Sequence, residues 1–288
     1  MGTLVSINGK IVSANDATVS VFDRGFLYGD SVFETVRTYG GKPFALHKHL
    51  ERLERSAALV FIDVPVTRSE LTAEIEELVA QAGNEESYLR IIVTRGQGEL
   101  GLDPSAAVSA NRVVITAPLH PPAPQLYQSG IKVITFRTQR ATDAVGAEGA
   151  KVGNYLSSVL AMREAKKVGA LEALIVDAKG RVIEGATSNL FWLQGGTLFT
   201  PPLEVGILAG ITRAYVLEAA KSLQRPVQQL APKLKELLSA EEVFISSSIR
   251  ELLPVVAVDG KQIGTGSPGP ITRELHQRFR QMVTERSS

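Results

Sequence analysis

Residues 119–125 read LHPPAPQ, and this stretch decides how the chain is divided. Three prolines in seven residues favour a stiff, extended connector, because proline fixes φ and cannot continue a helix or a central strand. No other stretch of the 288 residues reads as a convincing linker. We therefore predict a small N-terminal domain over residues 1–118 and a larger domain over residues 126–288, joined by a linker at 119–125.

The segment before the linker alternates short apolar strands with two helices, which indicates an α+β fold. Strands are expected at residues 4–7, 31–39, 88–94 and 112–117. Apolar side chains at helical spacing predict one helix over about 46–60. A second helix should begin at the capping box formed by Thr67 and Glu70 and end at Gly83.

The segment after the linker also mixes strands and helices. We expect a strand at 131–136, then a helix that follows Lys151 and ends at Gly169. Turn residues at 177–180 and 194–196 predict hairpins, and later helices should begin near Ile211 and Pro270.

The composition favours a globular protein that acts on small molecules. The 31 basic and 30 acidic residues give a net charge of +1, which offers no field to attract nucleic acid or an anionic membrane. No cysteine is present, so Cys-based zinc sites and disulfides are excluded, and the chain fits a reducing cytoplasm. His47 and His49 are two residues apart and do not share a helix face, so no metal site is expected.

One glycine-rich stretch imitates a nucleotide-binding motif. Residues 96–101 read GQGELG after a predicted strand, which matches G-x-G-x-x-G. The glycines of such a motif should open a helix, but here they lead into Leu102-Asp103-Pro104 and another strand. We therefore predict a loop, which could border a site.

A single lysine stands among small residues in EGAKVGNYLSS, residues 148–158. Lysine attacks carbonyl groups only when its amine is partly unprotonated, which needs desolvation or a nearby cation. The small neighbours of Lys151 leave room for a ligand to approach. The alternative, from this stretch alone, is a solvated lysine before a helix.

Five segments in order extend this observation to most of the chain. They read DRGFLYGDSVFETVRTYGGKPFALHKHLERLERSA (23–57), KVGNYLSSVLAMREA (151–165), VIEGATSNLFW (182–192), FTPPLEVGILAGITR (199–213) and EVFISSSIRELLPVVAVDG (242–260). Over about residues 4–280 the chain resembles the class IV pyridoxal-phosphate aminotransferases, which include branched-chain and D-amino acid aminotransferases and aminodeoxychorismate lyases. The resemblance implies a two-domain fold of type IV, with a small N-terminal α/β domain and a larger, mixed, barrel-like C-terminal domain.

The resemblance also assigns three catalytic residues. Lys151 matches the lysine that carries the cofactor as a Schiff base and shuttles the proton between the substrate's α-carbon and the cofactor's C4′. Glu184 matches the carboxylate that keeps the pyridine nitrogen protonated, although from sequence alone it could be a surface acid at a strand end. Tyr155 resembles the tyrosine that hydrogen-bonds the cofactor's phenolic oxygen.

The phosphate of the cofactor needs donors and positive potential. Gly210, Ile211 and Thr212 would form the start of a helix, whose N–H groups and dipole suit an anion. By resemblance Arg52 and Ser248 are further phosphate ligands. Periodicity alone would place Arg52 on a solvated helix face with neighbouring charges.

Substrate contacts follow from the same resemblance, and these positions are Tyr28, Phe33, Thr35, Arg37, Tyr88, Arg90, Ile249 and Arg250. Arg90 matches the arginine that pairs with the distal carboxylate of glutamate, which suits 2-oxoglutarate as the amino acceptor. A salt bridge at a strand end is the alternative for Arg90.

We expect a cytoplasmic, homodimeric transaminase that moves an amino group between a branched-chain or other apolar amino acid and a 2-oxo acid. Thr35 departs from the glycine usual in branched-chain enzymes and keeps aminodeoxychorismate lyase open as an alternative. A D-amino acid or (R)-amine transaminase is the second alternative, although Leu100 and Leu102 replace the arginine and histidine of the D-amino acid enzymes. A cofactor-binding protein without activity is the hypothesis from another class.

Overall fold

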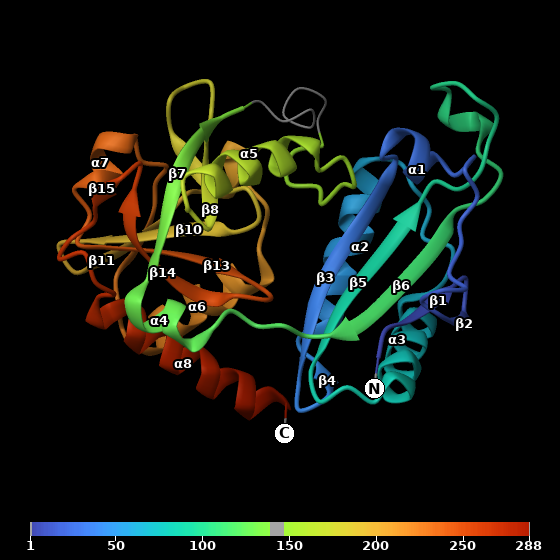
Figure 1. Cartoon of the computed structure of the whole chain (residues 1–288), viewed down its shortest axis with the longest axis horizontal. Helices are drawn as coiled ribbons and strands as arrows, with labels where there is room; N and C mark the ends of the chain where they lie inside the picture. The colour runs from blue at the N-terminus through green and yellow to red at the C-terminus, as the bar shows by residue number, and fades with distance from the viewer. Residues whose placement is uncertain (1, 139–146, 288) are drawn as a thin grey trace. The chain divides into compact units, whose positions relative to one another are not determined.

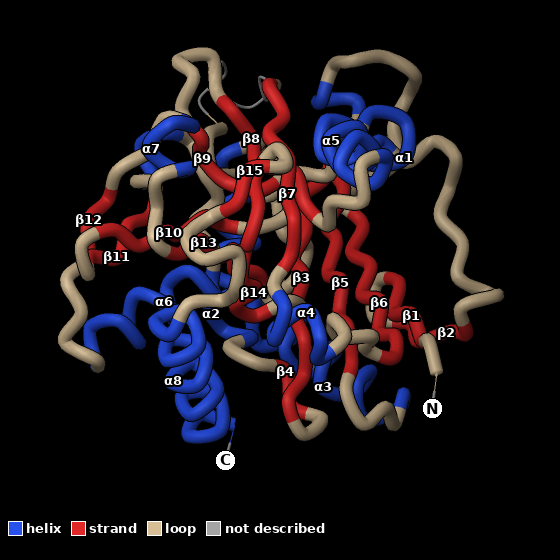
Figure 2. The backbone as a smooth tube through the Cα atoms, turned by 60° about the vertical axis from the view of Figure 1, so that its left-hand side comes forward, coloured by secondary structure: helices blue, strands red, loops and turns tan. Residues whose placement is uncertain are grey.

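The computed structural model describes residues 2–138 and 147–287, which fall into two compact units (Figures 1 and 2). One unit holds the described residues up to His120 together with Ala150–Asn154, and the other holds those of Pro121–Gly149 and Tyr155–Arg286. The segment around Lys151 therefore groups with the first unit, whereas the sequence assigned it to the second domain. The linker at residues 119–125 remains a proposal.

The elements of the first unit, in chain order, are β1 (Leu4–Ile7), β2 (Lys10–Ser13), α1 (Arg24–Tyr28), β3 (Ser31–Tyr39), β4 (Lys42–Pro43), α2 (Leu46–Leu59), α3 (Arg68–Ala82), β5 (Ser87–Thr94), a 3₁₀ turn η1 (Pro104–Ala106) and β6 (Asn111–Pro118). All four strands expected before the linker are confirmed to within one residue at each end. Helix α3 has the predicted capping box at Thr67 and ends at Gly83, which has a φ of 60°.

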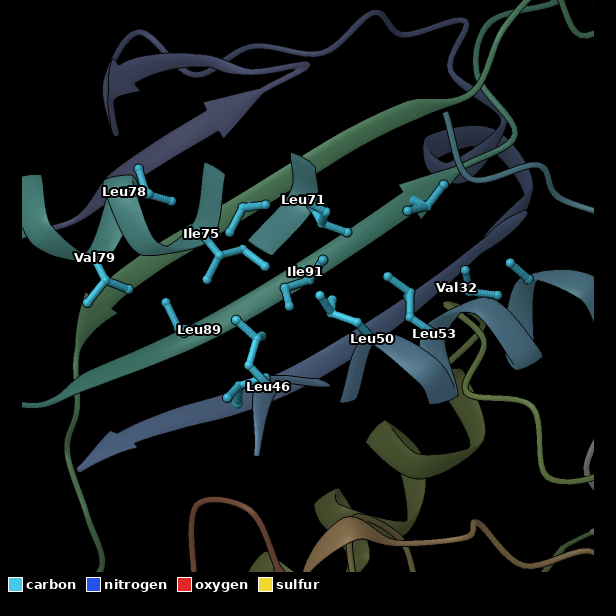
Figure 3. Close-up of a cluster of buried hydrophobic side chains, with 14 of the residues drawn as sticks. Val32, Leu46, Leu50, Leu53, Leu71, Ile75, Leu78, Val79, Leu89 and Ile91 are labelled. Atoms are coloured by element: carbon cyan, nitrogen blue, oxygen red, sulfur yellow. The ribbon is translucent and has the colours of Figure 1, made fainter. Parts of the chain in front are cut away.

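Six strands within the described part of this unit form one antiparallel sheet in the order β2-β1-β6-β5-β3-β4. Apolar side chains of β3 and β5 meet those of α2 and α3 in a buried cluster (Figure 3). Ile75, Leu78, Leu89 and Ile91 are fully buried in it. Each such side chain stabilises the fold by roughly 1.5–3 kcal/mol, so this face of the sheet holds α2 and α3 in place.

Alternation along β3 assigns its residues to two faces. Val32 and Val36 belong to the cluster under the helices. Because successive strand residues point to opposite faces, Glu34 lies on the helix side with them, while Phe33, Thr35 and Arg37 lie on the other face.

The elements of the second unit, in chain order, are α4 (Pro124–Ser129), β7 (Ile131–Arg137), α5 (Leu156–Lys167), β8 (Glu172–Val176), β9 (Val182–Gly185), β10 (Asn189–Gln194), β11 (Thr197–Thr200), a 3₁₀ turn η3 (Leu203–Val205), α6 (Ile211–Ser222), β12 (Val227–Gln229), α7 (Leu234–Leu238), β13 (Glu242–Ser247), β14 (Glu251–Val258), β15 (Lys261–Gln262) and α8 (Pro270–Ser287). Helices α6 and α8 begin at Ile211 and Pro270 as predicted. The end of the predicted extended linker is wrong, because Pro124 opens α4. Proline suits the first turn of a helix, where its missing N–H is not needed.

Nine strands among the residues described here form a mixed sheet in the order β12-β11-β10-β13-β14-β7-β8-β9, with β15 beside β14. Strand β7 runs parallel to both β14 and β8, whereas β8–β9, β10–β13 and β13–β14 are antiparallel. The sheet curls so that β9 and β10, at distant places in this order, come into contact. The core includes Trp192 and the stacked pair of Phe191 and Phe244, whose ring centroids are 4.9 Å apart. The mixture of helices and sheets confirms the α+β class.

Among the helices of residues 2–138 and 147–287, none has the length and apolarity needed to span a membrane.

Candidate active site

Lys151 lies beside β3, and not at the start of a helix. Its N–H donates to Ser56 Oγ at 3.1 Å, and its C=O accepts from the N–H of Phe33 at 3.0 Å. Val152 bridges to Val32, so the segment runs along the strand, and α5 begins only at Leu156. The helix predicted after Lys151 is present as α5, which ends at Lys167, but Lys151 itself stands five residues before its first residue.

Gly153 explains part of the small-residue pattern around Lys151. A Cβ on Gly153 would lie 2.1 Å from Ser31 Oγ, which is far inside contact distance. Glycine at this position is therefore needed for the close approach to β3. The room that we expected for a ligand at this residue is occupied by the chain itself.

Beneath the Lys151 segment lies a buried charge cluster formed by β3 and α2. Glu34 Oε1 accepts from Arg52 Nε at 2.6 Å, and Glu34 Oε2 accepts from Arg52 Nη2 at 2.8 Å. His49 Nδ1 lies 2.7 Å from Glu34 Oε2, and because an ionised carboxylate can only accept, His49 Nδ1 carries the proton. All three side chains are at most 5% exposed.

The charges in this cluster set its ionisation. Burial opposes ionisation of Glu34, but the charges and hydrogen bonds of Arg52 and His49 outweigh burial and lower the pKa of Glu34 to about 2. Burial lowers the pKa of His49, and so do the charges of Arg52 and Lys151, against the raising effect of Glu34. The alternative of a solvated Arg52 is wrong, because the carboxylate of Glu34 draws this side chain into the unit.

Five predicted substrate residues share the face of the sheet opposite α2 and α3. Thr35 pairs with Arg90, and Arg37 pairs with Tyr88, so these four side chains point to the same side as Phe33. The guanidinium carbon of Arg90 lies 3.9 Å from the centroid of the Phe33 ring, and Lys151 Nζ lies 4.4 Å from it. The lysine amine and the arginine therefore contact one aromatic ring.

Arg90 has no ion pair with an acidic side chain within residues 2–138 and 147–287. It is half-buried on β5. Among the described residues, the alternative of a salt bridge at the strand end is therefore not found.

Tyr28 belongs to another part of the first unit. It is the last residue of α1, and its hydroxyl accepts from the N–H of Gly101 at 3.0 Å. The glycine-rich segment at 96–101 is a loop, as predicted, and Arg24 donates to the carbonyls of Gly101, Leu102 and Asp103 in and after it.

The second unit carries the predicted pyridine carboxylate. Glu184 lies on β9, is 3% exposed, and its Oε2 accepts from the N–H of Leu208 at 3.1 Å. The alternative of a surface acid is wrong, because β9 is buried along its whole length. Asn189 on β10 donates to the C=O of Leu208 at 2.9 Å, so two strands hold the loop before α6.

The N-terminus of α6 has no side-chain cap. Its N-cap Gly210 has no side chain to cap the first turn, where Ile211 and Thr212 lie buried. A Cβ on Gly210 would lie 1.9 Å from Asn189 Oδ1. No side chain therefore caps the first N–H groups, which lie at the positive end of the helix dipole.

Ser248, Ile249 and Arg250 form the three-residue loop between β13 and β14, because Ser247 pairs with Glu251. Tyr155 is the half-buried N-cap residue of α5. Both features belong to the second unit, with Glu184 and the start of α6.

Sequence reasoning missed five residues that hydrogen-bond the predicted ones directly or through one intermediate partner, namely Glu34, His49, Ser56, Asn189 and Glu172. For Glu34 a signal was present, because alternation in VFETV places an acid among core valines. For the other four residues the signal lies in spatial contacts that a single sequence does not display.

The chain also matches known proteins along most of its length. A family model described as amino-transferase class IV matches residues 31–258. A putative branched-chain-amino-acid aminotransferase of Methanocaldococcus jannaschii is 39% identical and covers 98% of this chain and 96% of its own. A D-alanine aminotransferase of Bacillus licheniformis is 32% identical over 97% of this chain and 96% of its own.

Solved structures extend the agreement to the fold. A branched-chain amino acid aminotransferase of Escherichia coli has a TM-score of 0.92, 32% identity, and coverage of 100% of this chain and 97% of its own. A second branched-chain amino acid aminotransferase, from the organism abbreviated T.th., was solved with pyridoxamine 5′-phosphate. It has a TM-score of 0.93, 32% identity, and coverage of 99% of this chain and 95% of its own. The fold of type IV is thereby confirmed, and the chain belongs to the class IV aminotransferases.

Proposed function

We propose that this aminotransferase moves an amino group between a branched-chain or other apolar L-amino acid and 2-oxoglutarate. One observation carries the proposal: Lys151 and Arg90 contact the same ring of Phe33, and Arg90 has no acidic partner in the described ranges. A dicarboxylic oxo acid could place its reacting end near the amine and its distal carboxylate on the guanidinium. The M. jannaschii and E. coli relatives are named as branched-chain enzymes, which supports the apolar donor.

The cofactor that fits these residues is pyridoxal 5′-phosphate. Lys151 supplies the primary amine that an aldehyde requires, and Glu184 supplies a buried carboxylate for the ring nitrogen. Gly210, Ile211 and Thr212 supply an uncapped helix start for the phosphate, with Arg52 and Ser248 as further donors. Tyr155 is the donor proposed for the phenolic oxygen.

When bound, the cofactor supplies an electron-withdrawing ring that stabilises negative charge on the substrate's α-carbon. Lys151 Nζ would take the proton from that carbon and return it, a contribution of about 10² to 10⁴ in rate for a well-placed base. Glu184, whose carboxylate accepts from Leu208, would hold the proton on the ring nitrogen.

Side-chain selection would come from the face of the sheet that holds Phe33 and Arg90. Phe33, Thr35, Arg37 and Tyr88 line this face together with Arg90. The aromatic rings suit an apolar donor, while Arg90 serves the acidic acceptor. The backbone of Ile249 and Arg250 in the second unit would bind the α-carboxylate, and Tyr28 is a proposed contact of the side chain.

We further propose a cytoplasmic homodimer. Large apolar side chains stand exposed in the first unit, with Phe22 at 52%, Phe26 at 68% and Leu102 at 79%, and on α5, with Leu156 at 70%. A second copy of the chain is the partner that would cover them. Light scattering should give twice the 31.0 kDa of one chain. The cytoplasmic location is supported by a composition without cysteine.

The test is the visible absorption spectrum of the purified protein with L-leucine, L-glutamate or D-alanine in separate cuvettes without an acceptor. Loss of the cofactor's visible band with L-leucine and L-glutamate supports the proposal. Lys151→Ala should abolish both responses. A band that moves only with D-alanine refutes an L-amino acid as the donor. A band that none of the three compounds moves points to aminodeoxychorismate lyase, the alternative suggested by Thr35 in place of the glycine of branched-chain enzymes.

A further inference from the structure

Glu172, the first residue of β8, has a fully buried carboxylate with four donors. Its Oε1 accepts from the N–H of Ala173 at 3.0 Å. Its Oε2 accepts from Thr187 Oγ1 at 2.6 Å, from Ser188 Oγ at 3.3 Å and from Arg250 Nη1 at 2.6 Å. The mechanism proposed above gives this carboxylate no role.

The donors come from two separate loops of the second unit. Thr187 and Ser188 lie in the connection between β9 and β10, directly after the strand that carries Glu184. Arg250 ends the loop between β13 and β14, and strand β7 separates β14 from the β8 strand of Glu172 in the sheet. The carboxylate thus ties two loops that the backbone pairing leaves apart.

The loop between β13 and β14 depends on such contacts for its shape. The N–H of Arg250 donates to Ser247 Oγ at 3.3 Å, and its C=O accepts from Tyr127 Oη at 3.0 Å. The next residue, Glu251, has a φ of 54°, a conformation that L residues rarely adopt. The ion pair with Glu172 adds a side-chain restraint to these backbone contacts.

We propose that Glu172 is a positioning residue of the active site. It holds Arg250 on one side and Thr187 with Ser188 on the other, and so fixes the two loops relative to each other. This inference rests on the proposed function, because that function assigns the phosphate to Ser248 and the substrate carboxylate to the backbone of residues 249–250. Glu172 touches neither ligand.

The ionised form of Glu172 is essential to this role. Both oxygens of the carboxylate accept hydrogen bonds and its charge pairs with Arg250, whereas the amide of Glu172→Gln has the same shape but replaces one acceptor with an N–H donor and carries no charge. A loop displaced by about 1 Å can lower the rate by up to about 10²-fold. We therefore expect kcat/KM for L-leucine and 2-oxoglutarate to fall by about 10- to 100-fold, chiefly through KM.

The test compares holoenzyme variants by steady-state kinetics and by amide hydrogen exchange of residues 185–189 and 247–251. Glu242→Gln is the matched control. Glu242 is also a buried strand-starting carboxylate of the second unit, with three hydrogen bonds to Ile271 and Thr272 at the start of α8. Its variant should lower the melting temperature without a change in KM or in exchange of the two loops.

A raised KM and faster exchange in both loops, in Glu172→Gln but not in Glu242→Gln, would support the proposal. Equal KM and equal loop exchange in the two variants would overturn it and leave Glu172 as a purely structural residue. If Glu172→Gln does not fold, Arg250→Gln breaks the same ion pair from its other side and is tested by the same two measurements. The Arg250 side chain is 20% exposed, so a substitution there is less disruptive to the fold. A wild type without activity on either substrate would refute the proposed function, while the exchange comparison would still decide the role of Glu172.

Discussion

Glu34→Gln is the substitution that tests the charge cluster most directly. The pKa of Glu34 is about 2 instead of its ordinary 4.5, because Arg52 and His49 overcome the cost of burial. This difference corresponds to about 3 kcal/mol of stability at neutral pH. Loss of one partner from a buried ion pair costs about 3–5 kcal/mol, since the other charge stays buried. We expect Glu34→Gln to lower the free energy of unfolding by about 3–5 kcal/mol at pH 7.

The pH dependence distinguishes this charge effect from lost packing. The pKa of Glu34 is lower in the folded state, so its contribution is complete above pH 4.5 and disappears as the pH falls toward 2. Between pH 7 and pH 3 the free energy of unfolding of the wild type should fall by about 2 kcal/mol as Glu34 becomes protonated. The variant has no such group, so the difference in stability between the two proteins should narrow by the same amount. Urea unfolding followed by far-UV circular dichroism measures this difference in stability. Tryptophan fluorescence would not report on the first unit, because the single tryptophan, Trp192, lies in the other unit.

Glu54→Gln on α2, the helix that carries Arg52 and His49, is the control. Glu54 pairs with Arg68 on the surface, where the two side chains are 38% and 42% exposed, so its loss should cost less than about 1 kcal/mol. A difference between wild type and Glu34→Gln that stays constant from pH 7 to pH 3 would refute the role of ionisation. A difference below about 1 kcal/mol at pH 7 would refute the cluster as a source of stability.

Three further substitutions test the close contacts and the core. A Cβ added by Gly153→Ala would lie 2.1 Å from Ser31 Oγ, so this substitution should displace the Lys151 segment and lower kcat at least about tenfold. Adding Ser31→Gly to the same chain removes the clash and should restore kcat. Gly210→Ala adds a Cβ that meets an oxygen of Asn189, so it should weaken the binding of pyridoxal phosphate about tenfold, as measured by equilibrium dialysis. An unchanged affinity would show that the start of α6 does not bind the phosphate. Ile75→Ala should lower the free energy of unfolding of the first unit by about 2–5 kcal/mol, and a loss below about 1 kcal/mol would contradict its complete burial.

Strands and caps were predictable because their signals are local. The alternation in β3 and the capping box at Thr67 depend on residues within one element, and both are confirmed. The path of Lys151 was not predictable, because pairing with β3 depends on residues about 120 positions earlier. Arg52 was assigned to the phosphate only through family resemblance, since its helix alone reads as charged and solvated. The buried ion pair with Glu34 overturns the solvated interpretation.

The missed supports of the site share one physical character. Glu172 and Asn189 act through hydrogen bonds to loops that are distant in sequence. Polar side chains in buried strands do stand out in a sequence, but their partners do not. The absence of an acidic partner for Arg90 in the described ranges is likewise visible only in three dimensions.

The two-faced register of β3 has a consequence for the ways in which this enzyme can change. Positions 32, 34 and 36 serve the interior of the unit, and positions 33, 35 and 37 serve the face proposed for substrate. Substitution at positions 33, 35 and 37 could therefore alter substrate selectivity while the buried core of the unit is retained. An insertion or deletion of one residue would exchange the two sets and destroy both, so diversification of this strand must proceed by replacement alone.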